Sequence, residues 1–382
     1  MQTWIEINAA ALRKNLASFQ KATGRPVMAV VKSNAYGHGL EETVEALRGF
    51  ADWFGVNSIE EALRVRKIDP ATPLLIMGAN EPEQYAALKE ISVKPELVVS
   101  SIEAIQSLQE QAPGTRFHLK VDTGMSRLGF HGSAFETVLT YLADHPALPW
   151  CGLMTHFANV EDVTDQEYAL LQLERFAKAR EKSLQAAGKR ALLFHSAASG
   201  AALILPSARM DLVRVGISLY GMWPSRETRI SARSMSSADL PADFDLMPAL
   251  TWKTRIVHVN SIEAGTPVGY GCTHRPVQDS RVAVLPVGYF EGYDRRLSNQ
   301  SHVLIRGKRA PLLGRVCMNM IMVDITHIPE AAVGTEVVLI GTSGAETVSA
   351  DDLAGLSDTI NYQVTTAIQS DLTRILLREI PE

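Results

Sequence analysis

The chain has 382 residues, of which 46% are hydrophobic and 21% charged, a composition typical of a globular protein of two or three domains. A formal net charge of -5 and the absence of a long apolar run argue against a nucleic-acid partner or a membrane partner. Three scattered cysteines provide neither a disulfide framework nor a metal site, and the first residues lack the apolar core of a secretory signal. We therefore expect a cytoplasmic protein.

Up to about residue 220, short apolar runs alternate with segments whose apolar residues have helical spacing. The apolar runs predict strands at 26–31, 54–57, 73–77, 96–100, 116–122, 150–155, 191–195 and 211–215. The helical spacing predicts helices at 9–22, 40–49, 58–68, 102–111, 132–144 and 165–187. This alternation favours an α/β fold, a (β/α)8 TIM-type barrel over residues 8–225, with a doubly wound open sheet as the competing interpretation.

The pattern changes after residue 225. Residues 225–248 are polar and predict a linker or surface loop. A second, β-rich C-terminal domain is predicted over residues 245–382, with helical structure at the end of 350–377. Residues 1–7 contain a further strand that could pair with this domain instead of the barrel. The strands predicted in the second domain are 250–260, 281–287, 302–306, 321–325 and 336–340.

A lysine stands where the first apolar run of the barrel ends. Lys32 follows the run at 26–31 and precedes a turn rich in Gly, Asn and Ser. In a barrel this end of a strand belongs to the active face. Partial desolvation there lowers the pKa of a lysine and frees its amine as a nucleophile. From the spacing alone, a solvated lysine at a strand end is the alternative.

The motif VVKSNAYGHG at 30–39 closely resembles the cofactor-lysine motif of the alanine racemase family, which are fold-type III pyridoxal-phosphate enzymes. Other segments resemble that family in the same order over nearly the whole chain: KVDTGMSRLGF at 120–130, GLMTHFAN at 152–159, VRVGISLYG at 213–221, VGYG at 268–271, GRVCMNM at 314–320 and TINY at 359–362. The resemblance implies a homodimer with shared active sites that uses pyridoxal 5'-phosphate to interconvert L- and D-alanine, either for cell-wall peptidoglycan or to degrade D-alanine.

The same resemblance implies which residues hold the cofactor. Lys32 would carry it as a Schiff base, and Arg214 would contact its pyridine nitrogen. An arginine keeps its proton, so that nitrogen would stay unprotonated, and the weaker electron sink would disfavour transamination. The remaining cofactor residues implied are Tyr36, His156, Ser199, Gly216, Ile217 and Tyr362. Without the resemblance, the alternatives are a helix N-cap for Ser199, a core aromatic for Tyr362 and an ion pair with Asp211 or another carboxylate for Arg214.

Racemisation needs a proton donor on each face of the reacting carbon. The resemblance assigns one face to Lys32 and the other to Tyr270 of the partner subunit. A tyrosine pKa must fall by about 2–3 units to serve near neutral pH, which corresponds to roughly 3–4 kcal/mol. His156 and Arg214 are the sources expected for that shift. The alternatives are a turn tyrosine between two glycines and a core histidine.

The resemblance implies that Arg127 binds the substrate carboxylate, for which its guanidinium fork is suited, and that the backbone of Met318 of the partner subunit helps. Lys120 lies seven residues before Arg127, and the resemblance implies that it is carbamylated and orients the arginine. The alternative is a Lys120 that faces the surrounding helices. Residues expected at the substrate entrance are Tyr289, Arg295 and Arg315.

Two departures from the family pattern stand out. Asn319 replaces the usual Asp and is expected to change the charge near the entrance. Residues 363–376 differ from the usual sequence of the family, so the C-terminal helix is uncertain. Two other functions are compatible with the sequence. One is a racemase of the same fold with broader substrates. The other is a non-catalytic pyridoxal-phosphate-binding barrel, which would not account for a second domain that carries Tyr270.

Overall fold

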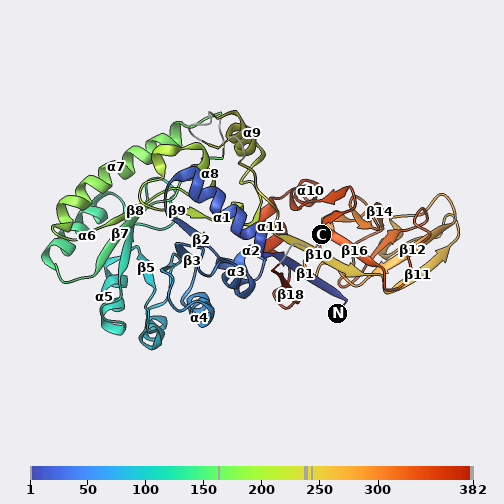
Figure 1. Cartoon of the computed structure of the whole chain (residues 1–382), viewed down its shortest axis with the longest axis horizontal. Helices are drawn as coiled ribbons and strands as arrows, with labels where there is room; N and C mark the ends of the chain where they lie inside the picture. The colour runs from blue at the N-terminus through green and yellow to red at the C-terminus, as the bar shows by residue number, and fades with distance from the viewer. Residues whose placement is uncertain (1, 162–163, 236–239, 242–243, 379–382) are drawn as a thin grey trace. The chain divides into compact units, whose positions relative to one another are not determined.

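The computed structural model describes residues 2–161, 164–235, 240–241 and 244–378, and it divides into two compact units (Figure 1). The barrel unit comprises residues 11–33 and 44–248. The β-rich unit comprises residues 1–10, 34–43 and 249–382. The last four residues of the predicted second domain lie outside the described residues, as do 236–239 and 242–243 of the predicted linker.

Within the described residues, the barrel unit contains an eight-stranded parallel sheet in the order β8-β7-β6-β5-β4-β3-β2-β9. Its strands are β2 (Val27–Val30), β3 (Trp53–Val56), β4 (Leu74–Ile76), β5 (Glu96–Val99), β6 (Phe117–Lys120), β7 (Trp150–Met154), β8 (Leu193–His195) and β9 (Val213–Val215). Hydrogen bonds from Asp211 N to Phe194 O (3.1 Å) and from Arg214 N to Ala197 O (3.0 Å) connect β8 to β9. Because consecutive strands are neighbours and the two ends meet, the barrel is confirmed and the doubly wound sheet is wrong.

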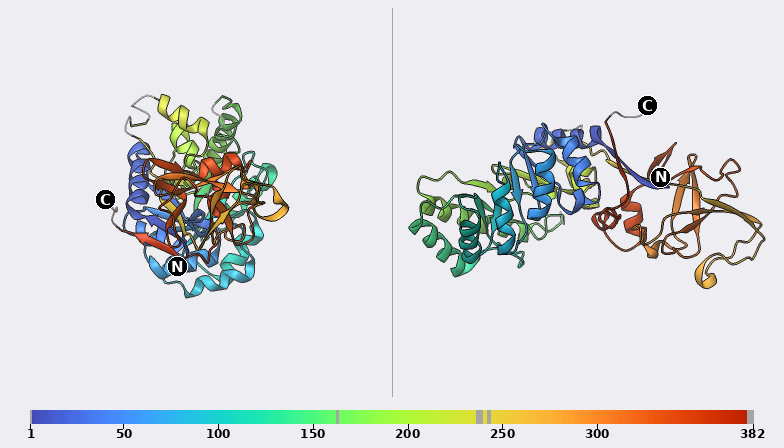
Figure 2. Two further views of the ribbon diagram at one scale, coloured as in Figure 1. Left: turned by 90° about the vertical axis from the view of Figure 1, so that its right-hand side faces the viewer. Right: turned by 90° about the horizontal axis from the view of Figure 1, so that it is seen from below.

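Helices cover the outside of the barrel strands (Figure 2). The predicted helices are confirmed as α1 (Ala9–Thr23), α3 (Leu40–Leu47), α4 (Ile59–Ile68), α5 (Ile102–Gln111), α6 (Gly132–Asp144) and α7 (Glu167–Ala187). The predicted loop at 225–248 is wrong in part, since it contains helix α9 (Arg226–Ser234). The Ser225 hydroxyl caps this helix by accepting a bond from Thr228 N at 3.0 Å, and its polar sequence still buries Thr228 and Ala232.

The β-rich unit places the N-terminal strand β1 (Thr3–Asn8) inside its sheet, in the order β11-β12-β15-β14-β13-β16-β10-β1-β18. β1 pairs antiparallel with β10 and parallel with β18, and its Ile5 and Ile7 are fully buried. The strands of this unit are β10 (Leu250–Arg255), β11 (His258–Ile262), β12 (Ser280–Leu285), β13 (His302–Ile305), β14 (Lys308–Leu313), β15 (Ile321–Asp324), β16 (Glu336–Ser343), β17 (Glu346–Val348) and β18 (Arg374–Leu377).

The C-terminal segment differs from the expectation that it ends as a helix. Helices α10 (Ala350–Leu356) and α11 (Asn361–Thr366) form, but the chain then becomes strand β18. The Arg374 guanidinium donates to the carbonyls of Gly37, Ser370 and Leu372 at 2.8–2.9 Å, which fixes the start of this strand. None of the described helices has both the length and the apolar character needed to cross a membrane.

Replacement of Ile5 by Ala should destabilise the β-rich unit. Ile5 is fully buried between β10 and β18, and truncation of such a side chain leaves a cavity that costs about 2–5 kcal/mol. Amide hydrogen exchange in β10 and β18 measures the loss. Val277→Ala is the matched control, because Val277 is 96% exposed and its truncation should change stability by no more than about 0.5 kcal/mol. Unchanged exchange in Ile5→Ala would contradict the sheet order.

Candidate active site

Lys32 begins a left-handed turn, α2 (Lys32–Tyr36), at the carboxyl end of β2. Residues 33–36 all have φ between 52° and 56°, although none is glycine. For L-residues this conformation costs roughly 1–2 kcal/mol each, so its surroundings must stabilise it. One support comes from Glu61 on α4, whose carboxylate accepts a 2.6 Å bond from Ser33 N. The turn therefore fixes the direction in which the chain leaves Lys32.

The Lys32 side chain is half-buried in an electropositive environment. Burial lowers the pKa of its amine, and the guanidinium groups of Arg127 and Arg214 lower it further, while Glu61 acts in the opposite direction. A lowered pKa increases the fraction of free amine near neutral pH, and the free amine is the nucleophilic form. The side chain can therefore attack a carbonyl group.

Arg214 on β9 is buried, with 3% of its surface exposed, and several bonds fix its guanidinium. Nη2 donates to the carbonyls of Thr155 and Ser196, both at 2.9 Å, and Nη1 donates to His195 Nδ1 at 2.9 Å. Nη2 also lies 3.4 Å from Nδ1 of His156. The Nε–H has no acceptor among the described residues. Burial lowers the pKa of Arg214 to about 10, so the group is a cation at neutral pH and keeps a donor available for a ligand.

Arg214 does not pair with Asp211, whose carboxylate instead accepts a bond from Phe194 N at 2.8 Å. The ion-pair alternative for Arg214 is therefore wrong. His156 is neutral, because burial and the cations Arg214 and Arg127 lower its pKa to about 3.

Ser199, Gly216 and Ile217 meet where β8 and β9 end. Ser199 is the first residue of α8 (Ser199–Ile204) and not its N-cap, which is Ala198, so the cap alternative is wrong. The Ser199 hydroxyl accepts a 3.0 Å bond from Gly216 N, and Ile217 begins the next helical turn, η3 (Ile217–Tyr220). With Gly216 N bound to it, the Ser199 hydroxyl can still donate its own proton, and it does so beside Ile217 N, where a barrel commonly binds phosphate.

Lys120 is the last residue of β6 and is 6% exposed. Burial lowers the pKa of its amine to about 8, with further lowering by Arg127, Arg214 and Lys32 against the opposing effect of Asp122. These cations belong to the active end of the barrel, which fits a Lys120 side chain that points inward and not toward the helices. The lowered pKa increases the fraction of neutral amine near neutral pH, and the neutral amine can combine with carbon dioxide, as a protonated amine cannot.

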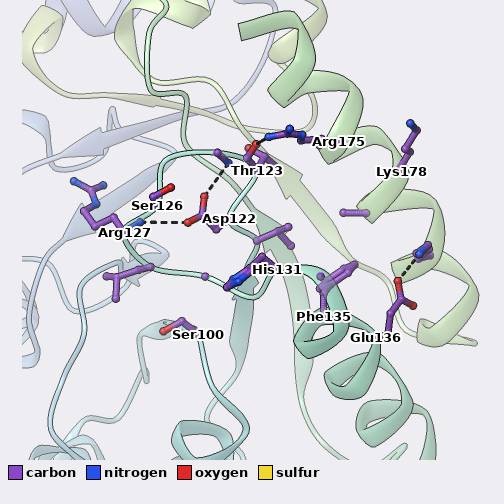
Figure 3. Close-up of a pocket in the computed structure, with 17 residues that line it drawn as sticks. Ser100, Asp122, Thr123, Ser126, Arg127, His131, Phe135, Glu136, Arg175 and Lys178 are labelled. Atoms are coloured by element: carbon purple, nitrogen blue, oxygen red, sulfur yellow. Dashed lines mark hydrogen bonds and ion pairs between the residues drawn. The ribbon is translucent and has the colours of Figure 1, made fainter. Parts of the chain in front are cut away.

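Arg127 is carried by a loop that Asp122 organises (Figure 3). One Asp122 carboxylate oxygen accepts bonds from the backbone of Gly124 (2.8 Å) and Met125 (2.7 Å), and the other accepts from Arg127 N (3.2 Å). A cavity of about 920 Å³ adjoins this loop. The Arg127 side chain is exposed and has no hydrogen-bond partner among the described residues, so its fork is available to an anion.

Tyr36 and Tyr362 lie together in the β-rich unit, with ring centroids 6.1 Å apart. Burial raises the pKa of Tyr36 to about 12, so its hydroxyl remains a donor at neutral pH. Gly37 allows this approach, because a Cβ there would lie 1.9 Å from the carbonyl oxygen of Thr365. The predicted role of Tyr362 as a phosphate ligand stays a prediction beside its alternative as a core aromatic.

Tyr270 protrudes from the β-rich unit, 72% exposed, between two glycines with left-handed φ. Tyr289 and Met318 are also exposed, and so are the guanidinium-bearing residues Arg295 and Arg315. The Met318 carbonyl accepts a 2.9 Å bond from Phe290 N, whereas its own N–H has no acceptor among the described residues. This N–H is therefore free to bind a carboxylate.

The unusual Asn319 has a local explanation. Its amide donates a 2.8 Å hydrogen bond to the carboxylate of Glu291, whose other oxygen accepts from Gly288 N at 2.7 Å. An aspartate at position 319 would place two carboxylates in contact, and like charges at that distance repel. The uncharged Asn319 is thus matched to Glu291, which explains the change of charge expected at this position.

A set of polar residues inside the barrel was not predicted from the sequence. His195 joins Arg214 to His118, and His118 joins Glu96, at the amino end of β5. A signal was available, because His118 and Lys120 are two residues apart on one strand and so share a face. The sequence does not show which strands lie opposite the face of β6 that carries His118 and Lys120, so their partners could not be predicted.

Comparisons with known proteins agree over the whole chain. A family model for the N-terminal domain of alanine racemase matches residues 7–224, and a model for its C-terminal domain matches residues 249–376. The alanine racemase of Leptospira interrogans is 42% identical over 98% of this chain and 96% of its own length. That of Symbiobacterium thermophilum is 37% identical, over 97% and 96%.

Solved structures agree with the sequence comparison. The alanine racemase of Streptomyces lavendulae has a TM-score of 0.89 at 28% identity and covers all of this chain and 98% of its own. The Bacillus anthracis alanine racemase with bound L-Ala-P has a TM-score of 0.87 at 31% identity, covering 99% and 95%. With the sequence motifs and the lysine–arginine site in the barrel, these matches show that the chain belongs to the alanine racemase family.

Proposed function

We propose that this protein interconverts L- and D-alanine with pyridoxal 5'-phosphate held on Lys32. The observation that carries the proposal is Arg214, a buried cation with an unused Nε–H at the same end of the barrel as a lysine of lowered pKa. The lysine can bind an aldehyde covalently, and the Nε–H can donate to a ring nitrogen that has a lone pair.

The surrounding residues fit the proposed cofactor. The Ser199 hydroxyl and the N–H of Ile217 would donate to its phosphate, and Gly216 N would do so after releasing the Ser199 hydroxyl. Tyr36 and Tyr362 stay predicted phosphate ligands. When bound, the cofactor supplies a ring that accepts negative charge from the reacting carbon. Arg214 would limit that acceptance, since a donor that keeps its proton leaves the ring nitrogen unprotonated. The proton would then return to the substrate carbon, which gives racemisation and not transamination.

Two groups would move the protons. Lys32 would serve one face of the substrate and Tyr270 of the partner subunit the other. Arg127 and the N–H of Met318 of the partner subunit would bind the substrate carboxylate, and neutral His156 would lie beside Arg214. Tyr289, Arg295 and Arg315 would line the entrance. The Bacillus anthracis structure with bound L-Ala-P supports a substrate of alanine size.

We further propose a homodimer with shared active sites. The β-rich unit exposes several large apolar side chains close in sequence to Tyr270 and Met318, which would be covered by a second copy of the chain. They include Tyr270, Tyr289, Phe290, Met318 and Met320. The three cysteines are free, which supports the proposed cytoplasmic location, and a role in supplying D-alanine for peptidoglycan belongs to the same proposal.

Lys32→Ala tests the function directly. The variant should lose the visible absorption of the bound cofactor, and the rate at which L-alanine becomes D-alanine should fall at least about a thousandfold, because the covalent link and one proton carrier disappear together. Chiral chromatography measures the conversion. Lys189→Ala, an exposed lysine of the barrel unit, is the matched control and should behave as the wild type. A Lys32→Ala protein that keeps the absorption band would assign the link to another lysine.

Lys120 should carry a carbamate whose occupancy rises with pH. Its pKa of about 8 means that the neutral amine, the form that reacts with carbon dioxide, increases as pH rises from 7 to 9. The carboxylated side chain would turn repulsion from Arg127 into attraction. Carbon-13 NMR in labelled bicarbonate should show a carbamate resonance that Lys120→Ala lacks. If the wild type shows no carbamate resonance at pH 9, the prediction that Lys120 is carbamylated is wrong.

Mixing two inactive variants tests the shared site. Lys32→Ala and Tyr270→Ala homodimers each lack one group in every site, but a mixed dimer has one site with both defects and one with neither. With random exchange, about half the dimers are mixed and activity should recover to about a quarter of wild type. Native mass spectrometry confirms the exchange. No recovery after confirmed exchange would mean that the two residues do not come from different chains.

A further inference from the structure

A continuous chain of hydrogen bonds runs through the barrel interior from Arg214 to Glu96. Nη1 of Arg214 lies 2.9 Å from His195 Nδ1, and His195 Nε2 lies 2.9 Å from His118 Nδ1. His118 Nε2 lies 2.6 Å from the Glu96 carboxylate. Both histidines are fully buried. His195 is the last residue of β8 and Glu96 is the first residue of β5, so the chain connects the active end of one strand to the opposite end of another.

All the hydrogen bonds of this series are donated in one direction, from Arg214 toward Glu96, because a guanidinium only donates and a carboxylate only accepts. A guanidinium only donates hydrogen bonds, so His195 Nδ1 must accept and its proton must be on Nε2. That proton is donated to His118 Nδ1, which places the His118 proton on Nε2, where Glu96 accepts it. Burial and then the charge of Arg214 keep the pKa of His195 well below its ordinary value, so the ring is neutral. Both histidines are therefore held in the Nε2–H tautomer.

A glycine on strand β7 leaves room for the hydrogen-bond chain to pass between β6 and β8. His118 on β6 and His195 on β8 are separated by β7, where Gly152 is paired with His118. A Cβ at Gly152 would lie 2.3 Å from His118 Nδ1, the atom that accepts from His195. Gly152 has no left-handed φ that would itself require glycine. The space above this glycine is used by the imidazole ring.

The far end of the chain is a charged carboxylate. Burial raises the pKa of Glu96, but the hydrogen bond from His118 and the charge of Arg116, 3.1 Å away, outweigh it and lower the pKa overall. Glu96, His118 and Cys151 have possible ligand atoms within 4.8 Å of one another. However, burial and Glu96 raise the pKa of the Cys151 thiol to about 12, and Arg116 already neutralises the carboxylate. The contacts thus favour the end of a hydrogen-bond chain over a metal site.

We propose that Glu96 is a positioning residue for Arg214, acting through His118 and His195 to fix the guanidinium that faces the cofactor. With Glu96 present, only the Nε2–H tautomers of both histidines give each of the three hydrogen bonds one donor and one acceptor. Without it, His118 Nε2–H loses its acceptor in a buried site, which weakens the preference for this pair of tautomers and leaves Arg214 to hold it alone. The effect on catalysis rests on the proposed function, whereas the tautomers do not.

The test compares Glu96→Ala and Glu96→Gln with Glu103→Gln, a control that alters an exposed carboxylate on α5. Nitrogen-15 NMR of histidine-labelled protein reports the tautomers without any activity. The wild type and Glu103→Gln should show His118 and His195 as Nε2–H. Glu96→Ala should show a mixture, with kcat about tenfold lower and KM changed less than about twofold, since one buried donor loses its acceptor.

Glu96→Gln should retain the tautomers and most of kcat, because an amide oxygen can accept the same bond. Gly152→Ala interrupts the chain independently and should reproduce the Glu96→Ala tautomer mixture. A wild type with either histidine as Nδ1–H would overturn the proposal, as would a Glu96→Ala protein with wild-type tautomers and kcat. If the wild type has the predicted tautomers but no racemase activity, the proposed function fails and the hydrogen-bond chain stands.

Discussion

The buried guanidinium of Arg214 determines how its surroundings are arranged, because it can donate hydrogen bonds but cannot accept them. The carbonyls of Thr155 and Ser196 and one nitrogen of His195 must therefore face it as acceptors. The Nε–H has no acceptor among the described residues and can donate to the lone pair of a ligand. A ring nitrogen supplies that lone pair only if it is not itself protonated, so the protein decides the protonation of the proposed cofactor.

Accumulated positive charge explains the other properties of the active end. Arg127, Arg214, Lys32 and Lys120 act on one another, and in both lysines burial and the neighbouring guanidinium groups lower the pKa. The same cations lower the pKa of His156. A site of this kind favours free amines and attracts anions, which are the properties that a carbonyl cofactor with a phosphate and a substrate with a carboxylate require.

Local sequence was sufficient for much of this structure. The spacing of apolar residues, together with the turn residues between the apolar runs, predicted the barrel strands and helices. The motif at 30–39 indicated Lys32. Strand β18 was not predictable in this way, because it forms by pairing with β1 at the other end of the chain. The left-handed φ of residues 33–36 was equally hidden, since no glycine occupies them. The chain from Arg214 to Glu96 depends on strand order and on the space above Gly152, which exist only once the barrel has closed.

The central claim is that Arg214 keeps the ring nitrogen of the bound cofactor unprotonated. Nitrogen-15 NMR of the protein reconstituted with ring-labelled pyridoxal 5'-phosphate measures this directly. We predict the chemical shift of an unprotonated pyridine that accepts a hydrogen bond, unchanged between about pH 6 and 9 because burial leaves the pKa of Arg214 at about 10. A shift typical of a pyridinium ion in that range would contradict the account.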